Sequence, residues 1–195
     1  FRGHRRIKLA RNLAYDTPSP QGDAAATMDE AQLFLGATDR YDFKLEGKEE
    51  KYIPYNNFKA HDAAQCSDAV LLKARHLNPD CVRWELHRTW HVSATLKPGF
   101  RHIYPKRDFW FDEDAPGYGL ADNYDSSHKL YRTTYTVSDP FYEMPGGFVQ
   151  YCTVDLATGL YHYIPSATDY GGFYSVPPKP DAYYSPEALA AEGVR

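Results

Sequence analysis

The sequence predicts a mainly β fold, in which one or two short helices pack on the apolar face of an antiparallel sheet. Residues 83–114 predict a long β-hairpin, in which residues 83–96 alternate between apolar and polar side chains almost strictly, the pattern of a strand with one buried and one solvent-exposed face. From Cys81 onward, turn sequences recur at short intervals, which favours a meander over βαβ units. The chain also has 17 Tyr, 10 Phe and 3 Trp, and these residues suit a broad, half-wet sheet.

The first third of the chain predicts short elements. Residues 1–16 predict a loose strand that gives way to a surface loop at the Pro-rich residues 17–20. Thr27 and Glu30 match a capping box, and Gly36 ends the helix that this motif begins. Residues 39–55 predict two short strands around a turn at residues 46–48. Residues 56–79 predict irregular structure with a weak helical patch near residues 69–74.

The rest of the sequence predicts a series of β-hairpins, followed by an extended C-terminal segment. We expect turns at residues 97–100, 115–117, 125–128 and 157–159. Residues 165–195 are rich in Pro and Tyr and predict an extended arm that ends in a short helix between Ser185 and Gly193. The length of 195 residues fits a single domain over residues 1–195. Because the chain opens on FRGHRRIKLAR, we expect it to be the C-terminal part of a longer precursor.

Composition and motifs argue against several functions. The formal net charge of −4 gives no general attraction to nucleic acid, and no apolar run approaches the roughly 20 residues that span a bilayer. The sequence has no GxSxG, HExxH or Gly-rich phosphate motif. His87 and His91 share one strand face about 13 Å apart, which is too far for one metal ion. We therefore expect no enzyme, no metal and no cofactor.

The three cysteines form no CxxC pair. Cys152 alternates with Val154 and Leu156, as a buried strand thiol would. Cys66 and Cys81 lie in loop-rich sequence, and two interpretations of them are open: a disulfide in an oxidising compartment, or two unpaired thiols.

Alternation also predicts which side chains of the long hairpin share a face. A turn at residues 97–100 would pair residues whose numbers sum to 197, so that Arg88 faces Phe109 and Trp90 faces Arg107. Ile103 and Phe111 then join the apolar face. Arg88 and Arg107 become diagonal neighbours, roughly 7 to 8 Å apart at their backbones.

An arginine on an apolar face needs an anion, because an unpaired charge there costs several kcal/mol. One interpretation is that Arg88 and Arg107 clamp the carboxylate or phosphate head of an amphiphile, whose tail is lined by Trp84, Trp90, Phe109 and Phe111. The other is that both arginines pair with internal acids such as Asp39, Asp42 or Asp122, or lie over aromatic rings. The sequence leaves this choice open.

Four segments carry a family resemblance: LARNLAYDTP, DRYDFKLEGKEEKYIPYNN, HLNPDCVRWELHRTWHVSATLKPGFRHIYPKRDFWFDED and ADNYDSSHKLYR. Between residues 9 and 135 the chain resembles a bacterial family of unknown function described as outer-membrane lipoprotein-sorting-like. The resemblance implies a periplasmic location and a curved, incomplete barrel similar to the lipoprotein carriers LolA and LolB, with the helices on its concave face. It also implies traffic of hydrophobic compounds beside exporters and outer-membrane barrels.

These observations together predict a periplasmic carrier or chaperone-like binder of a hydrophobic or amphiphilic small molecule. One alternative is an interaction module without a ligand of its own, which docks to an exporter or outer-membrane barrel. An ester hydrolase is a third alternative.

Overall fold

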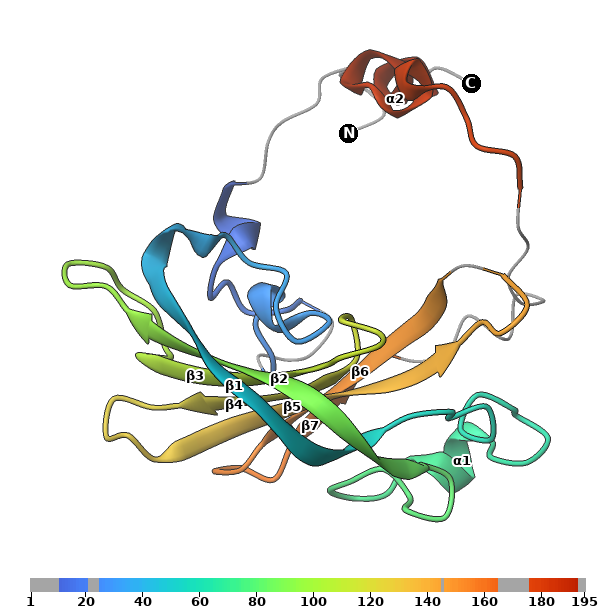
Figure 1. Cartoon of the computed structure of the whole chain (residues 1–195), viewed down its shortest axis with the longest axis horizontal. Coiled ribbons are helices and arrows are strands. Elements are labelled where there is room, and N and C mark those ends of the chain that lie inside the picture. Colours follow the sequence, from blue (N-terminus) through green and yellow to red (C-terminus); the bar gives the residue numbers. More distant parts are fainter. Residues whose placement is uncertain (1–10, 21–24, 145, 165–175, 193–195) are drawn as a thin grey trace. The chain divides into compact units, whose positions relative to one another are not determined.

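A computed structural model describes residues 11–20, 25–144, 146–164 and 176–192 (Figure 1). The chain divides into a unit of residues 12–171, which holds the sheet, and a second unit, of which residue 11 and residues 176–192 are described. In the second unit, the short helices η5 (Asp181–Tyr184) and α2 (Pro186–Glu192) follow an extended stretch. The Ser185 hydroxyl accepts a hydrogen bond from the Ala188 N–H (3.1 Å), so the terminal helix predicted at Ser185 is confirmed.

A seven-stranded antiparallel sheet forms the first unit, and the predicted mainly β meander is confirmed. Neighbouring strands in the sheet are also neighbours in the sequence, so β1 and β7 are its edges and the sheet is not closed (Figure 1). Turns fall at residues 115–117, 125–128 and 157–159, as predicted. The strands are β1 (Tyr41–Pro54), β2 (Trp84–Leu96), β3 (Lys106–Asp112), β4 (Gly119–Tyr124), β5 (Leu130–Pro140), β6 (Gly147–Asp155) and β7 (Tyr161–Tyr163).

Strand β1 is one strand of 14 residues, where the sequence predicted two. The predicted turn at residues 46–48 is a bulge, because the ladder with β2 passes from Leu45 to Gly47 with a shift in register. Gly47 has φ +140°, a conformation open to glycine and costly for other residues. A glycine flanked by charged residues can therefore bend a strand without ending it.

The register of β2 and β3 differs from the prediction by four residues. Trp90 pairs with Phe111, Val92 with Phe109 and Ala94 with Arg107, so paired numbers sum to 201. An even shift leaves each side chain on its predicted face. The turn is longer than predicted because residues 97–105 lie outside both strands. Ile103, expected on the apolar face, lies in this turn and is exposed.

Distant contacts hold this longer turn. The Tyr41 hydroxyl donates to the Tyr104 carbonyl (2.7 Å), and the Ile103 N–H donates to Asp16 (3.0 Å). His102 lies 3.0 Å from Asp29. These partners come from residues 16–41, so a local turn rule could not predict them.

The segment before β1 is mostly irregular. Its described helices are three 3-10 helices: η1 (Arg11–Ala14), η2 (Met28–Glu30) and η3 (Thr38–Arg40). The predicted opening strand is wrong at residues 11–14, and its residues 1–10 lie outside the described part. The capping box is present, with the Thr27 N–H donating to Glu30 (2.6 Å). The predicted helix to Gly36 is wrong because Gln32 and Leu33 have φ of 50° and 73°, which helices do not allow.

The segment between β1 and β2 packs on strands β5 to β7. Its short helix α1 (Asp68–Leu71) overlaps the predicted helical patch at residues 69–71 and ends before residues 72–74. Leu71, Leu77 and Val82 pack in a cluster with Val137 and Cys152. Val137 and Cys152 project from the sheet face opposite to Thr134 and Thr136, since side chains alternate along a strand. No helix in the described residues is long and apolar enough to cross a membrane.

Candidate functional site

Most apolar side chains of the first three strands share one face of the sheet, whereas Ile53 and Trp110 lie on the other. Cross-strand partners on this face include Phe43 with Ala94, and Val92 with both Leu45 and Phe109. The predicted grouping of these side chains on one face is therefore confirmed, but the expectation that the whole face is buried is wrong at Trp84 and Leu86, which are exposed. We call this the apolar face and define it by Tyr41, Phe43, Leu45, Tyr52, Trp84, Leu86, Trp90, Val92, Ala94, Leu96, Phe109 and Phe111.

Residues 25–36, which we call the covering segment, bury one part of the apolar face. Leu33 is fully buried and packs in one cluster with Ala94, Phe109 and Ala121. Phe34 meets the rings of Phe43 and Phe109 edge-on, with centroids 5.6 Å apart in both cases. The expected helix on the apolar face is thus replaced by an irregular segment that anchors itself through two adjacent side chains.

The rest of the apolar face meets solvent. We call its exposed members the open surface: Phe43 (40% exposed), Leu45 (59%), Tyr52 (64%), Trp84 (44%) and Leu86 (53%). Trp90, Val92 and Phe111 lie among them and are half-buried. Exposed apolar side chains that gather on one face indicate an interaction site, whereas scattered ones need no explanation. The apolar face therefore changes from core to candidate binding surface along the same strands.

Arg107 lies under the covering segment and pairs with an internal acid. Its side chain is fully buried, its Nη1 lies 2.6 Å from Asp29, and its Nε donates to Asn123 (2.7 Å). Burial by itself would raise the pKa of Asp29, but the hydrogen bond from His102 and the charge of Arg107 outweigh it and hold that pKa below its ordinary value. The acid is Asp29, rather than Asp39, Asp42 or Asp122.

The neighbouring acid Glu30 joins the same buried network. It accepts a hydrogen bond from the Asn123 amide (3.1 Å) and lies 3.6 Å from Arg132. Burial raises the pKa of Glu30, because the charges of Arg107 and Arg132 offset the loss of water only in part. This network fixes the covering segment to β3, β4 and β5.

Arg88 lies on the open part of the same face, far from Arg107. Its side chain is 63% exposed, and its Nη1 lies 3.8 Å from Glu113. Arg107 pairs across the ladder with Ala94, six residues from Arg88, which corresponds to about 20 Å along the strand. The two arginines are therefore not the diagonal neighbours that the predicted register required, and they form no shared clamp.

The four aromatic residues predicted to line a ligand tail divide between the two parts. Phe109 is buried, and Phe111 stacks beside it with ring centroids 5.7 Å apart. Trp90 is half-buried and Trp84 is exposed, with the Trp84 ring 5.4 Å from that of Tyr135. Trp90 and Phe111 are thus partly accessible on the apolar face, whereas the exposed Trp84 packs its ring against Tyr135, whose side chain projects from the opposite face of β5. The role of the four predicted residues in binding stays a prediction.

The opposite face of β1 to β3 carries an internally paired polar ladder. His87 Nδ1 lies 2.9 Å from Asp112, and His91 lies 3.2 Å from Asp108 and stacks on Trp110. Within the described residues, no three His, Cys, Asp or Glu side chains are arranged to hold a metal ion. These His and Asp side chains therefore pair with one another between β2 and β3.

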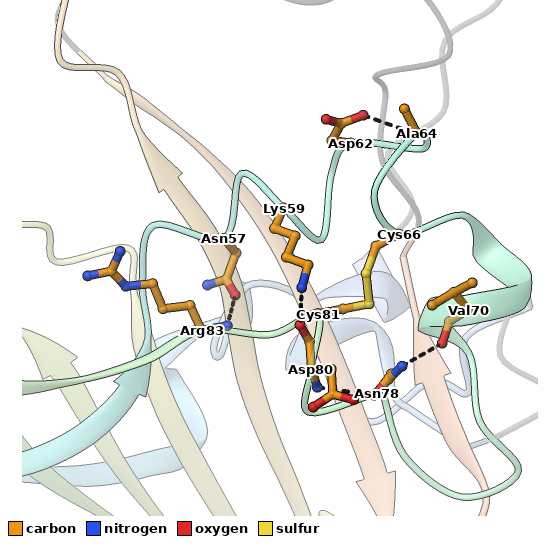
Figure 2. Close-up of a disulfide and its surroundings, with 10 residues drawn as sticks. All are labelled: Asn57, Lys59, Asp62, Ala64, Cys66, Val70, Asn78, Asp80, Cys81 and Arg83. Atoms are coloured by element: carbon orange, nitrogen blue, oxygen red, sulfur yellow. Dashed lines mark hydrogen bonds between the residues drawn. A yellow bond between two sulfur atoms is a disulfide. The ribbon is translucent and has the colours of Figure 1, made fainter.

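A disulfide joins Cys66 and Cys81, whose Cα atoms lie 6.1 Å apart (Figure 2). It closes the segment between β1 and β2, and hydrogen bonds hold the same segment: Asn57 accepts from the Arg83 N–H (2.8 Å) and Lys59 donates to the Asp80 carbonyl (2.7 Å). Of the two interpretations that the sequence left open, the structure shows the disulfide. Cys152 is a buried free thiol whose pKa burial raises to about 12.

Sequence reasoning missed the residues that decide how each arginine is paired. Asp29 sits inside the capping box and gave no sign of its contact with β3. Lys48 hydrogen-bonds to Glu113, and its ammonium lies 4.2 Å from the centre of the Trp90 ring. The position of Lys48 beside the bulge glycine would have placed it on the apolar face, had the bulge been predicted.

Comparison with known proteins adds a family and two relatives. An uncharacterised protein of Pseudomonas aeruginosa is 41% identical over 198 residues, which cover 99% of this chain and 43% of the relative. The chain thus spans less than half the length of this relative. A crystal structure of a DUF1329 family protein from Desulfovibrio piger is similar at 17% identity and a TM-score of 0.46, over 94% of this chain and 59% of that one. The family model described as protein of unknown function (DUF1329) matches residues 1–190, and the chain belongs to this family.

Proposed function

We propose that this chain is a periplasmic carrier or chaperone-like binder of a hydrophobic or lipid-like ligand, associated with outer-membrane transport. The open surface is the observation that supports this proposal, since Leu45, Tyr52 and Leu86 are exposed on a face that is core elsewhere. A hydrophobic ligand would remove these side chains from water, at roughly 25 cal/mol per Å² of apolar surface buried. The strands already hold the side chains in place, which limits the ordering cost of binding.

Two further observations support the proposal. The disulfide between Cys66 and Cys81 is typical of oxidising compartments such as the periplasm. The open, strongly amphipathic sheet also suits the proposed likeness to the LolA and LolB carriers.

Native mass spectrometry of the protein from its own source tests the proposal directly, because a retained lipid adds mass. Titration with a fluorescent fatty-acid probe gives a second test. Leu86→Ser should weaken probe binding about tenfold, equivalent to roughly 1.4 kcal/mol, with little loss of stability because Leu86 is exposed. Leu160→Ser is the matched control, since Leu160 is equally exposed (55%) but lies in the turn before β7. Equal effects of the two substitutions would contradict the proposal.

A docking module is the second candidate, and the free edge of β1 favours it. β1 pairs only with β2, so its other edge is bonded to no described strand (Figure 1). β1 also carries Phe43, Leu45 and Tyr52 of the open surface. A partner strand could extend the sheet there. Several Lys and Glu side chains along β1, however, are the kind that protect edges from such pairing. No observation on the described residues favours ester hydrolysis over binding.

A further inference from the structure

We propose that the open surface takes an amphiphile with an apolar chain and an anionic head, and that Lys48 and Arg88 bind this head. The inference rests on the proposed function and names the class of ligand for the same surface. The predicted head-binding pair was Arg88 and Arg107. Lys48 takes the place of Arg107 here, because Lys48 and Arg88 both approach the carboxylate of Glu113.

The two cations lie between the apolar ends of the open surface. Lys48 pairs with Trp90 in the ladder, and Arg88 pairs with Glu50. Phe43 and Leu45 precede these positions along β1, and Tyr52 follows them. An amphiphile whose head reached the centre would therefore have apolar side chains on either side for its chain.

Lys48 and Arg88 are held by surface ion pairs that an anionic head could replace. Lys48 and Arg88 both approach one carboxylate, that of Glu113. The hydrogen bond from Lys48 lowers the pKa of Glu113, so this carboxylate stays ionised. For Arg88, Glu113 is the only acid within 4.0 Å among the described residues, and Glu50 opposite it is exposed. Within the described residues, Lys48 and Arg88 thus share Glu113 as their ionic partner, and ion pairs at a surface hold their members only weakly.

A ligand head would exchange with Glu113 at this position. A carboxylate or phosphate would provide the acceptors that Lys48 and Arg88 share, and Arg88 could offer two parallel N–H groups to it. An uncharged head would leave the ion pairs of Glu113 in place and gain only the contacts of its chain. The apolar chain thus provides most of the binding affinity, whereas Lys48 and Arg88 provide selectivity for an anionic head.

The test compares palmitate with hexadecanol, which carry the same chain, by titration of the intact protein at neutral pH and low salt. We expect palmitate to bind about tenfold more tightly, the scale of one charged hydrogen bond. Lys48→Met and Arg88→Met should each cut this preference by about threefold or more while hexadecanol affinity stays constant. A lysophospholipid with a phosphate monoester head, measured against palmitate, distinguishes the two sources of the anion.

Glu113→Gln gives the sharper result. Removing the competing carboxylate should raise palmitate affinity about three- to tenfold and leave hexadecanol unchanged. Glu46→Gln is the matched control, because Glu46 pairs with Lys44 (2.6 Å) on the opposite face of the same strand and should change neither affinity. Melting curves confirm that each variant is folded.

The outcomes separate the two proposals. Equal binding of palmitate and hexadecanol would overturn the anionic head and leave the proposed hydrophobic carrier intact. Weaker palmitate binding by Glu113→Gln would also overturn it, because Glu113 would then support the ligand instead of competing with it. Failure of both compounds to bind would overturn the proposed function itself.

Discussion

Arg107 and Arg88 lie on the same face of the same sheet, yet one is fully buried and the other is 63% exposed. The difference follows from the covering segment, which brings Asp29 to Arg107 and brings no acid to Arg88. Burial of a charge costs several kcal/mol unless a partner is supplied, so Arg107 can be buried only where Asp29 reaches it. The apolar face is therefore core where residues 25–36 cover it and an exposed surface elsewhere.

Substitution of the two arginines by methionine should give the largest contrast. Arg107→Met leaves Asp29 buried without its cation, and we expect it to lower the free energy of unfolding by about 3–5 kcal/mol. Arg88→Met should change it by less than about 1 kcal/mol, because the Arg88 ion pair is exposed. Urea denaturation measures both, and similar costs would contradict the division of the face.

Substitution of apolar residues compares the covered part of the apolar face with the open surface without changing any charge. Phe109→Ala removes a buried ring from the cluster under Leu33 and should cost about 3–5 kcal/mol. Leu86→Ala, on the open surface, should cost less than about 1 kcal/mol. Thermal unfolding at fixed pH ranks the two, and a large cost at Leu86 would show that the open surface is packed in solution.

Removal of the disulfide tests how much the segment between β1 and β2, which covers the opposite face of the sheet, contributes to stability. Replacing Cys66 and Cys81 together by Ala opens a link with a sequence separation of 15, and the chain-entropy model assigns such a loop about 3 kcal/mol. Chemical denaturation with and without reductant should show this loss in the parent protein and no dependence on reductant in the variant. Cys152→Ala serves as the thiol control. Three labelled cysteines in the unreduced parent protein would refute the link.

Alkaline pH should lower the free energy of unfolding by a smaller amount, through the buried Tyr41 and Tyr104. Burial raises the pKa of Tyr41 and of Tyr104, so these groups keep their protons in the fold while the unfolded chain loses them near pH 10. Stability is therefore present below about pH 10 and falls as pH rises above it. Tyr41→Phe should reduce this slope in denaturation curves between about pH 8 and 11. Tyr52→Phe, on the open surface, is the control, and an equal reduction there would argue against the assignment.

Local sequence rules determined the sidedness of the sheet and most of its turns. The alternation from Trp84 to Leu96 needs no tertiary information, because side chains of a strand project to opposite sides in turn. Glycine and proline likewise mark the turns at residues 115–117 and 157–159, where Gly159 has φ +73°. The mainly β fold and the apolar face could be predicted for this reason.

Tertiary structure alone decided the register, the cover and the pairing of the charges. The longer turn before β3 depends on contacts of Tyr104 and Ile103 with residues 16–41. The register of β2 and β3 could therefore not be predicted from the sequence of the hairpin alone. The helix expected after Thr27 gives way to left-handed Gln32 and Leu33, whose conformation is held by the packing of Leu33. Arg107 meets Asp29 across 78 residues of sequence, and only the folded chain brings the two together. Sequence alternation specifies which way a side chain points, whereas long-range packing specifies what it meets there.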